Sequence, residues 1–165
     1  DDTCNIVIVS FHGGAEGAEY QHVSGEKEIF YGEDRSDVAG FARMVIDNGA
    51  DIVFGHGPHV TRAIDIYRDR FIAYSLGNFL TYRRFNLSGP NGYSPLVLVT
   101  TDTEGGFRGA RIVPLYQDSQ GCVRIDPSKR AIRKIIELTA ADFPGSQLTI
   151  GEEGDVKLKE DYNGK

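Results

Sequence analysis

Residues 48–60, NGADIVFGHGPHV, combine the end of a helix, a buried strand and a loop with two histidines. Gly49 predicts the helix end, because glycine readily takes the left-handed conformation found there. Residues 51–54 form a short, mainly apolar run, which is typical of a buried strand. The strand ends at Gly55-His56. A helix leading into such a strand indicates an α/β protein.

The preceding residues repeat this pattern of an apolar run that ends at a histidine. Residues 6–11, IVIVSF, predict a strand buried on both faces, as in the middle of a layered α/β domain. Residues 13–35 are rich in glycine and glutamate and predict a long loop, which in a compact domain usually has a function. Ser36 is a candidate N-cap for a helix with apolar residues at helical spacing over 38–45.

The following residues predict mainly hairpins. Alternating residues 64–67 and the apolar run 71–76 form the first, and residues 96–99 with 107–115 form the second. An irregular loop covers residues 82–95 between them. A helix from Pro127-Ser128 to residue 142 and a last hairpin over 148–158 complete the chain. We therefore expect two parts, residues 1–117 and a C-terminal extension over 118–165.

Composition excludes several classes of function. The 165 residues carry a net charge of −6 without a Lys/Arg stripe, which argues against a nucleic-acid partner. The densest basic patch, at residues 129–134, is typical of a solvated helix face. Cys4 and Cys122 are too few for a disulfide framework and lack metal-thiolate spacing. No apolar run is long enough to span a membrane.

The abrupt start at Asp1 favours an excised part of a longer protein, so any membrane attachment would use other segments.

Polar residues follow three of the predicted strands: His12, His56 with His59, and Asn78. Ligand sites of layered α/β proteins lie beyond the carboxyl ends of strands. Neutral imidazole is the commonest metal ligand, and Gly57-Pro58 can aim two rings inward from one tight loop. This pair favours a functional over a structural role, whereas His12 alone fits either. His22 lacks a supporting pattern and is predicted to be solvated.

Three blocks of the sequence resemble one protein family. Residues 48–60 look very like the block "aGADlViGhHPHV" of the bacterial capsule-synthesis family (CapA-like, poly-γ-glutamate), and residues 74–79 match its block YSLGNF. Residues 9–16 are similar to its block "vSlHWGxE". The likeness covers roughly residues 5–116. Gly13 stands where the family usually has Trp, Gly17 where it has Tyr, and Gly57 where it has His.

The resemblance implies a part of a calcineurin-like metallophosphatase: a layered αββα sandwich with a mixed sheet, flanking helices and a hairpin-rich C-terminal region. It implies two divalent ions in the intact protein, and the mixed ligand set favours Mn, Fe or Zn. By resemblance the metal ligands are His12, His56 and His59. His56 and His59 would also be catalytic, and Glu16 and Asn78 would bind substrate. The substrate would be a phosphoester or an anionic polymer.

The metallophosphatase pattern also requires Gly-Asp and Asn-His motifs before the first histidine block, and none precedes residue 6. We therefore expect the N-terminal half of the same domain to be a partner of this chain. We expect the chain alone to be inactive and to be metal-free or partly occupied. Two functions stay open: a metal-dependent hydrolase, or a non-catalytic assembly or polymer-binding component of an extracellular polymer machinery. Either one places the intact protein at a bacterial cell surface.

Overall fold

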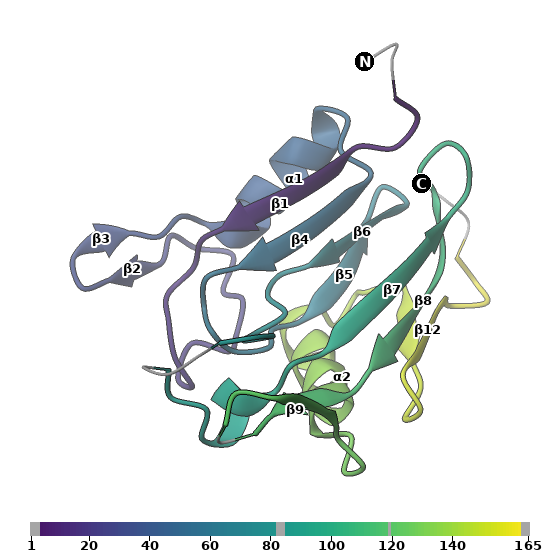
Figure 1. Cartoon of the computed structure of the whole chain (residues 1–165). Helices are drawn as coiled ribbons and strands as arrows, with labels where there is room; N and C mark the ends of the chain where they lie inside the picture. Colours follow the sequence, from purple (N-terminus) through teal and green to yellow (C-terminus); the bar gives the residue numbers. More distant parts are fainter. Residues whose placement is uncertain (1–3, 82–84, 119, 163–165) are drawn as a thin grey trace.

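A mixed sheet positions the histidines. The computed structural model describes residues 4–81, 85–118 and 120–162, so residues 82–84 of one predicted loop lie outside it. The first sheet has the order β1-β4-β6-β5. β1 pairs in parallel with β4, β4 pairs in parallel with β6, and β5 is antiparallel to β6 (Figure 1). Its strands are β1 (Ile8–His12), β4 (Ile52–His56), β5 (Ile64–Tyr67) and β6 (Arg70–Ala73).

A second sheet is antiparallel and combines residues from both predicted parts of the chain. Its order is β11-β12-β8-β7. The strands are β7 (Leu96–Thr101), β8 (Phe107–Val113), β11 (Leu148–Ile150) and β12 (Asp155–Leu158). The three predicted hairpins are present, and β12 pairs with β8 as well as β11. The C-terminal residues thus extend the sheet begun by residues 96–113.

Two helices and several short elements complete the architecture. They are α1 (Val38–Asp47), α2 (Arg130–Asp142), the 3-10 turn η1 (Gly89–Gly92), β2 (Ile29–Phe30), β3 (Glu33–Asp34), β9 (Leu115–Gln117) and β10 (Val123–Ile125). The cap of α1 is Asp37, whose carboxylate accepts from the amides of Ala39 and Gly40. The prediction of Ser36 was wrong by one residue. β2 and β3 form a small hairpin inside the predicted loop 13–35 and project from the body (Figure 1).

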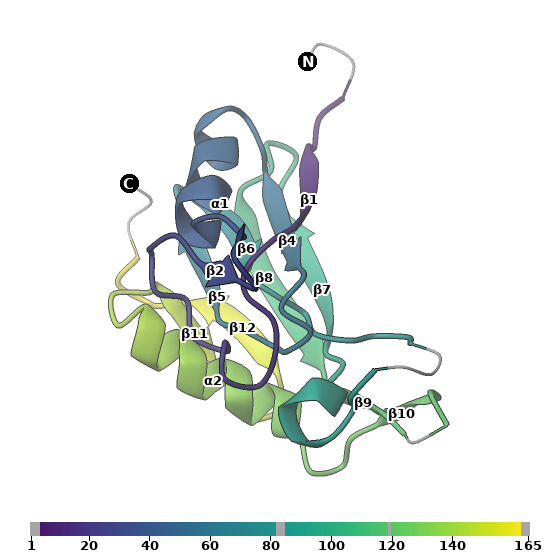
Figure 2. The same ribbon diagram turned by 90° about the vertical axis from the view of Figure 1, so that its left-hand side faces the viewer.

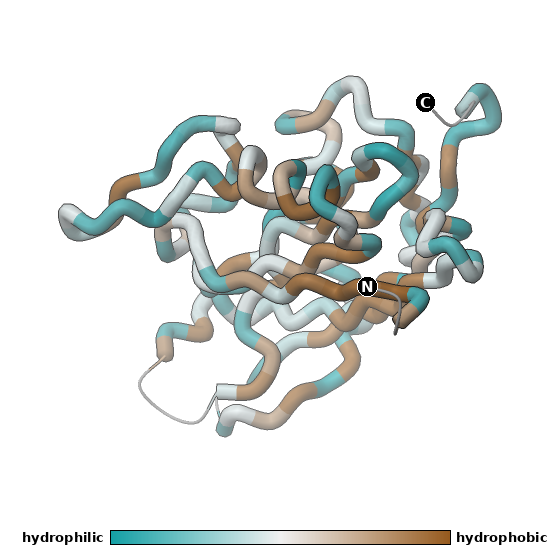
Figure 3. The backbone as a smooth tube through the Cα atoms, turned by 90° about the horizontal axis from the view of Figure 1, so that it is seen from above, coloured by the Kyte–Doolittle hydropathy of each residue, from teal (hydrophilic) through white to brown (hydrophobic). Residues whose placement is uncertain are grey.

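The core has two clusters, one on each face of the first sheet. The larger cluster joins this sheet to the second sheet and α2 through side chains such as Phe71, Phe107 and Ile132. The other packs α1 against β4 and β6 through residues such as Ala42 and Val53. Figure 2 shows α2 beside β11 and β12, and Figure 3 shows apolar segments through the middle of the molecule. The chain is therefore a mixed α/β protein with two facing sheets. No helix in the described residues is long and apolar enough to cross a membrane.

The position of β1 differs from the prediction. It lies at the edge of its sheet, and its residues alternate between exposed and half-buried. Ile8 has 58% of its surface exposed. The prediction of a central strand buried on both faces was therefore wrong for the described residues. The physical reason is that an apolar run predicts a strand whose side chains are buried, but it does not specify which segment buries them.

Candidate functional site

His12 and His56 end two neighbouring parallel strands. They are register partners in the pairing of β1 with β4, so both rings leave the sheet at the same rim. Burial lowers the pKa of His56 from its usual 6.5, and the nearby His12 lowers it further. A lowered pKa keeps this imidazole neutral at neutral pH, which leaves a nitrogen lone pair available to a ligand.

The loop after β4 brings His59 to the same rim. The His12 and His59 ring centroids are 6.5 Å apart. His59 has a φ of 59°, a left-handed conformation that is uncommon for residues other than glycine. Such strained positions cluster at functional sites, where the surrounding structure holds them. The structure therefore gathers the three predicted histidines, two from strand ends and one from a strained turn.

Gly57 and Gly13, two of the departures from the family blocks, lie against each other. Gly57 has a φ of 119°, and a Cβ atom added to it would lie 2.6 Å from the carbonyl oxygen of Gly13. The amide of Gly13 donates to the carbonyl of His56 at 2.8 Å. The two backbones thus approach too closely for a side chain at residue 57.

Each ring nitrogen of His59 faces one of the two residues that were predicted to bind substrate. Its Nδ1 lies 2.7 Å from Oδ1 of Asn78, and its Nε2 lies 3.9 Å from Oε2 of Glu16. The ring of Phe85 lies 5.2 Å from the His59 ring, centroid to centroid. Glu16 and Asn78, predicted as substrate-binding, are thus brought to the histidines, and their roles stay predictions.

The site contains one residue that the sequence did not indicate. Arg35, at the end of the long loop, forms an ion pair with Glu16 and donates from Nε to the carbonyl of Gly14 at 3.3 Å. Its side chain is mostly buried, so it offsets part of the charge that Glu16 brings to the rim. The pair spans 19 residues, and no local pattern marks it.

The histidines have suitable chemistry for a metal, but the described residues do not complete a site. Within residues 4–81, 85–118 and 120–162, no group of three or more His, Cys, Asp or Glu side chains is placed to hold a metal ion. Divalent metal sites of this type need carboxylate or further nitrogen donors around the ion. The residues that the structure describes therefore do not by themselves fit a two-metal centre.

Comparison with known proteins places the chain in a family. The model of the family described as "Bacterial capsule synthesis protein PGA_cap" matches residues 1–83, which is half of the 165 residues. The chain belongs to the PGA_cap family. This PGA_cap chain is 39% identical over 77 residues to the PGA biosynthesis protein CapA of Bacillus subtilis (strain 168), covering 46% of the chain and 17% of that protein.

Two further relatives give the same picture. Identity is 34% over 76 residues to the capsule biosynthesis protein CapA of Bacillus anthracis, covering 46% of the chain and 15% of that protein. It is 40% over 97 residues to the uncharacterized protein y4sH of Sinorhizobium fredii (strain NBRC 101917 / NGR234), covering 47% of the chain and 20% of that protein. The PGA_cap chain therefore spans a fifth or less of the length of these relatives.

A buried ion pair holds the long loop of this PGA_cap chain against the histidine turn. Arg62 is fully buried, and its two terminal nitrogens each lie 2.8 Å from a carboxylate oxygen of Glu28. Arg62 also donates to the carbonyls of Tyr20 and Ala15. Sequence reasoning missed this pair, although an arginine directly before Ala63-Ile64 and close after Val60 is a signal, since buried arginine requires partners.

His22 lies apart from the other histidines. Its ring is exposed as predicted, but its Nδ1 lies 2.6 Å from Oδ1 of Asp142 at the end of α2. The same carboxylate accepts from the amide of Val23 at 2.9 Å. His22 therefore ties the loop to α2 and takes no part in the rim.

An apolar cavity of about 320 Å³ opens between the two sheets and reaches the histidine rim. His56 lines it together with residues of β1, β4 and β7 and the loops between them. The full lining is Ser10, Phe54, His56, Leu76, Gly77, Phe79, Pro95, Leu96 and Val97. β1 and β7 are both edge strands, and Ile8, Leu96 and Leu98 on them are exposed. The two sheets of this PGA_cap chain are thus open on one side.

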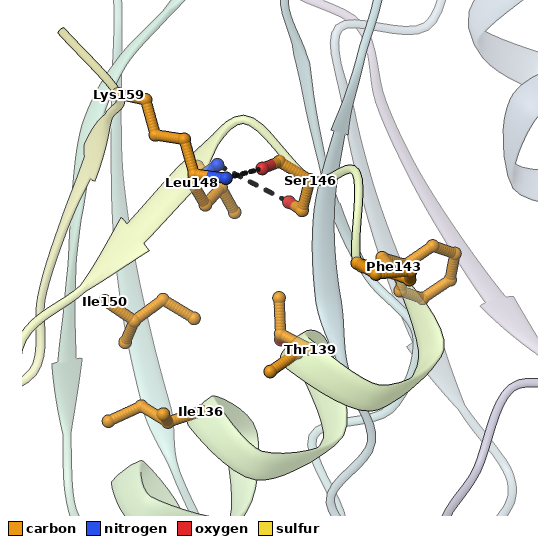
Figure 4. A pocket seen from close by; sticks show the side chains of 9 residues that line it. Ile136, Thr139, Phe143, Ser146, Leu148, Ile150 and Lys159 are labelled. Carbon is orange, nitrogen blue, oxygen red and sulfur yellow. Dashed lines mark hydrogen bonds between the residues drawn. The ribbon is translucent and has the colours of Figure 1, made fainter.

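A second cavity, of about 260 Å³, lies between α2 and β11 (Figure 4). Apolar side chains such as Ile136 and Leu148 line most of it, and Lys159 at one end donates to the carbonyl of Ser146 at 2.6 Å. None of its lining residues belongs to the histidine rim. It carries no cluster of chemically reactive groups.

Proposed function

We propose that this chain supplies the histidine part of a metal-dependent, phosphoesterase-type site in a longer capsule-synthesis protein. The observation that carries the proposal is the convergence of His12, His56 and His59 at one rim that borders an open sheet edge. The remaining donors would come from other parts of the polypeptide. Relatives five or more times longer than the matched region leave ample sequence for them.

The open side of the sandwich indicates where those other parts dock. An edge strand with free backbone groups and exposed apolar side chains is a template for a further strand. β1 and β7 both have this character, and the cavity between them leads to His56. We therefore propose that the N-terminal half of the same domain covers this side. The two facing sheets with α1 outside are compatible with a completed calcineurin-like sandwich.

The ligand roles that we propose are those that the family resemblance implies. His12, His56 and His59 would bind two divalent ions together with the missing donors, and the mixed nitrogen and oxygen set favours Mn, Fe or Zn over Mg or Ca. His56 and His59 would also be the catalytic residues. Glu16 would face the substrate, a phosphoester or an anionic polymer, and Asn78 lies at the other nitrogen of the His59 ring. The names of the relatives support a cell-surface, extracytoplasmic setting.

A second function is a non-catalytic assembly or polymer-binding component. The ion pair of Glu16 with Arg35 favours it, because it gives the rim a fixed structure without a metal. The net charge of −6 does not help this chain to hold an anionic polymer by general attraction.

Substitution of His56 in the full-length protein separates the two functions. We expect His56→Ala to abolish metal-dependent release of product from a chromogenic phosphodiester, because the ring would be a metal donor. The stability cost should be about 1 kcal/mol, as for a typical substitution. His22→Ala is the matched control and should leave the activity unchanged. A folded His56→Ala protein with unaltered activity and unaltered capsule formation would overturn the catalytic proposal in favour of the assembly role.

A further inference from the structure

The side chain of Asn78 uses every polar atom it has. It is buried, its Nδ2 donates to the carbonyl of His59 at 3.1 Å and to the carbonyl of Asn91 at 3.0 Å, and its Oδ1 faces Nδ1 of His59 at 2.7 Å. We propose that Asn78 is a positioning residue that holds the proton of neutral His59 on Nδ1 and leaves Nε2 as a free acceptor.

The two carbonyl contacts fix the orientation of the amide. An Asn amide has two hydrogens to donate and one oxygen that accepts. If the amide were turned over, its oxygen would face the carbonyl oxygens of His59 and Asn91, and both hydrogens would be lost to them. Leaving these two carbonyls unpaired is unfavourable, because each would lose its hydrogen bond. Oδ1 must therefore face His59, and a neutral ring can answer it only with a hydrogen on Nδ1.

The backbone around Asn78 is also held in place. Its carbonyl accepts from the hydroxyl of Ser94, which is fully buried. The preceding Gly77 has a φ of 68°, and a Cβ atom there would lie 2.7 Å from the carbonyl oxygen of Tyr93. The amide thus reaches His59 from a rigid support, which is the usual requirement for orienting a functional imidazole.

A proton on Nδ1 gives His59 a defined outward face. Its Nε2 lone pair then shares the space in front of the rim with Oε2 of Glu16, 3.9 Å away. A single ion with nitrogen and oxygen ligands each about 2 Å away would bring such atoms to at most about 4 Å from each other. Nε2 of His59 and Oε2 of Glu16 can therefore both contact one cation or one hydrogen-bond donor. This role concerns the ring itself and does not depend on the reaction.

The tautomer can be read directly from the 165-residue chain by nitrogen NMR. We expect the ¹⁵N-¹H correlations of the neutral rings to show His59 protonated on Nδ1, with His59→Gln identifying its signals. Asn78→Ala removes the acceptor and should shift His59 toward the Nε2-protonated form that exposed imidazoles prefer. Asn48→Ala removes an exposed Asn far from the rim and should leave the His59 signals unchanged.

Each outcome decides the assignment. A wild-type His59 protonated on Nε2 would overturn it, and this measurement does not use Asn78→Ala, so it holds even if that variant does not fold. A folded Asn78→Ala chain with the His59 tautomer unchanged would also overturn it. Loss of activity in the full-length protein without a tautomer change would assign Asn78 to substrate and not to positioning.

Discussion

Glu28→Ala should lower the free energy of unfolding by about 3 kcal/mol or more. The substitution leaves the fully buried Arg62 without its carboxylate, and removing one partner of a buried ion pair typically costs about 3–5 kcal/mol. The loss should also release the loop that Arg62 holds through the carbonyls of Tyr20 and Ala15. Urea unfolding followed by circular dichroism measures the change.

The matched control is Glu26→Ala, two residues earlier in the same loop. Glu26 is exposed, and surface substitutions of this kind usually change stability by about 0.5 kcal/mol or less. Equal midpoints for Glu28→Ala and Glu26→Ala would mean that water hydrates Arg62 in the folded chain. The ion pair would then have no structural role.

Gly57→His introduces the residue that the family block has at this position. It should destabilise the chain by about 2 kcal/mol or more. A φ of 119° suits only glycine among the ordinary residues, and the added Cβ would lie 2.6 Å from the carbonyl oxygen of Gly13. The two loops must then separate, which breaks the hydrogen bond from Gly13 to His56. Thermal and urea unfolding both report the loss.

Gly25→His separates the backbone strain from the collision. Gly25 also has a positive φ, of 71°, but no atom lies within 4 Å of a Cβ placed there. Its cost should be about 1–2 kcal/mol, the penalty for a left-handed residue. A Gly57→His chain as stable as Gly25→His would show that the loops at Gly13 and Gly57 are free to move apart.

Local sequence patterns predicted most of the elements. Apolar alternation and turn residues gave the hairpins β5–β6, β7–β8 and β11–β12, and helical spacing gave α1 and α2. These features depend on neighbouring residues, so a single sequence contains them. The pairing of β12 with β8 joins segments more than 40 residues apart, which no local period encodes.

The edge position of β1 and the ionic contacts of the site were not predictable in the same way. The apolar pattern of residues 6–11 predicts a buried strand, whether the segment that packs against it belongs to this chain or to another part of the protein. The histidines were found because Gly57-Pro58 marks a constrained turn between two metal-binding residue types. Arg35 and the pair of Arg62 with Glu28 were not found, because their partners are 19 and 34 residues away.

We propose above all that this chain carries the histidine part of a metal site that other segments complete. Elemental analysis after dialysis tests it most directly, on the 165-residue chain and on the full-length protein side by side. We expect substoichiometric metal on the chain and bound Mn, Fe or Zn on the full-length protein, lost in both His56→Ala and His59→Ala. A full pair of ions on the chain alone would contradict the claim, as would a metal content of the full-length protein that both substitutions leave unchanged.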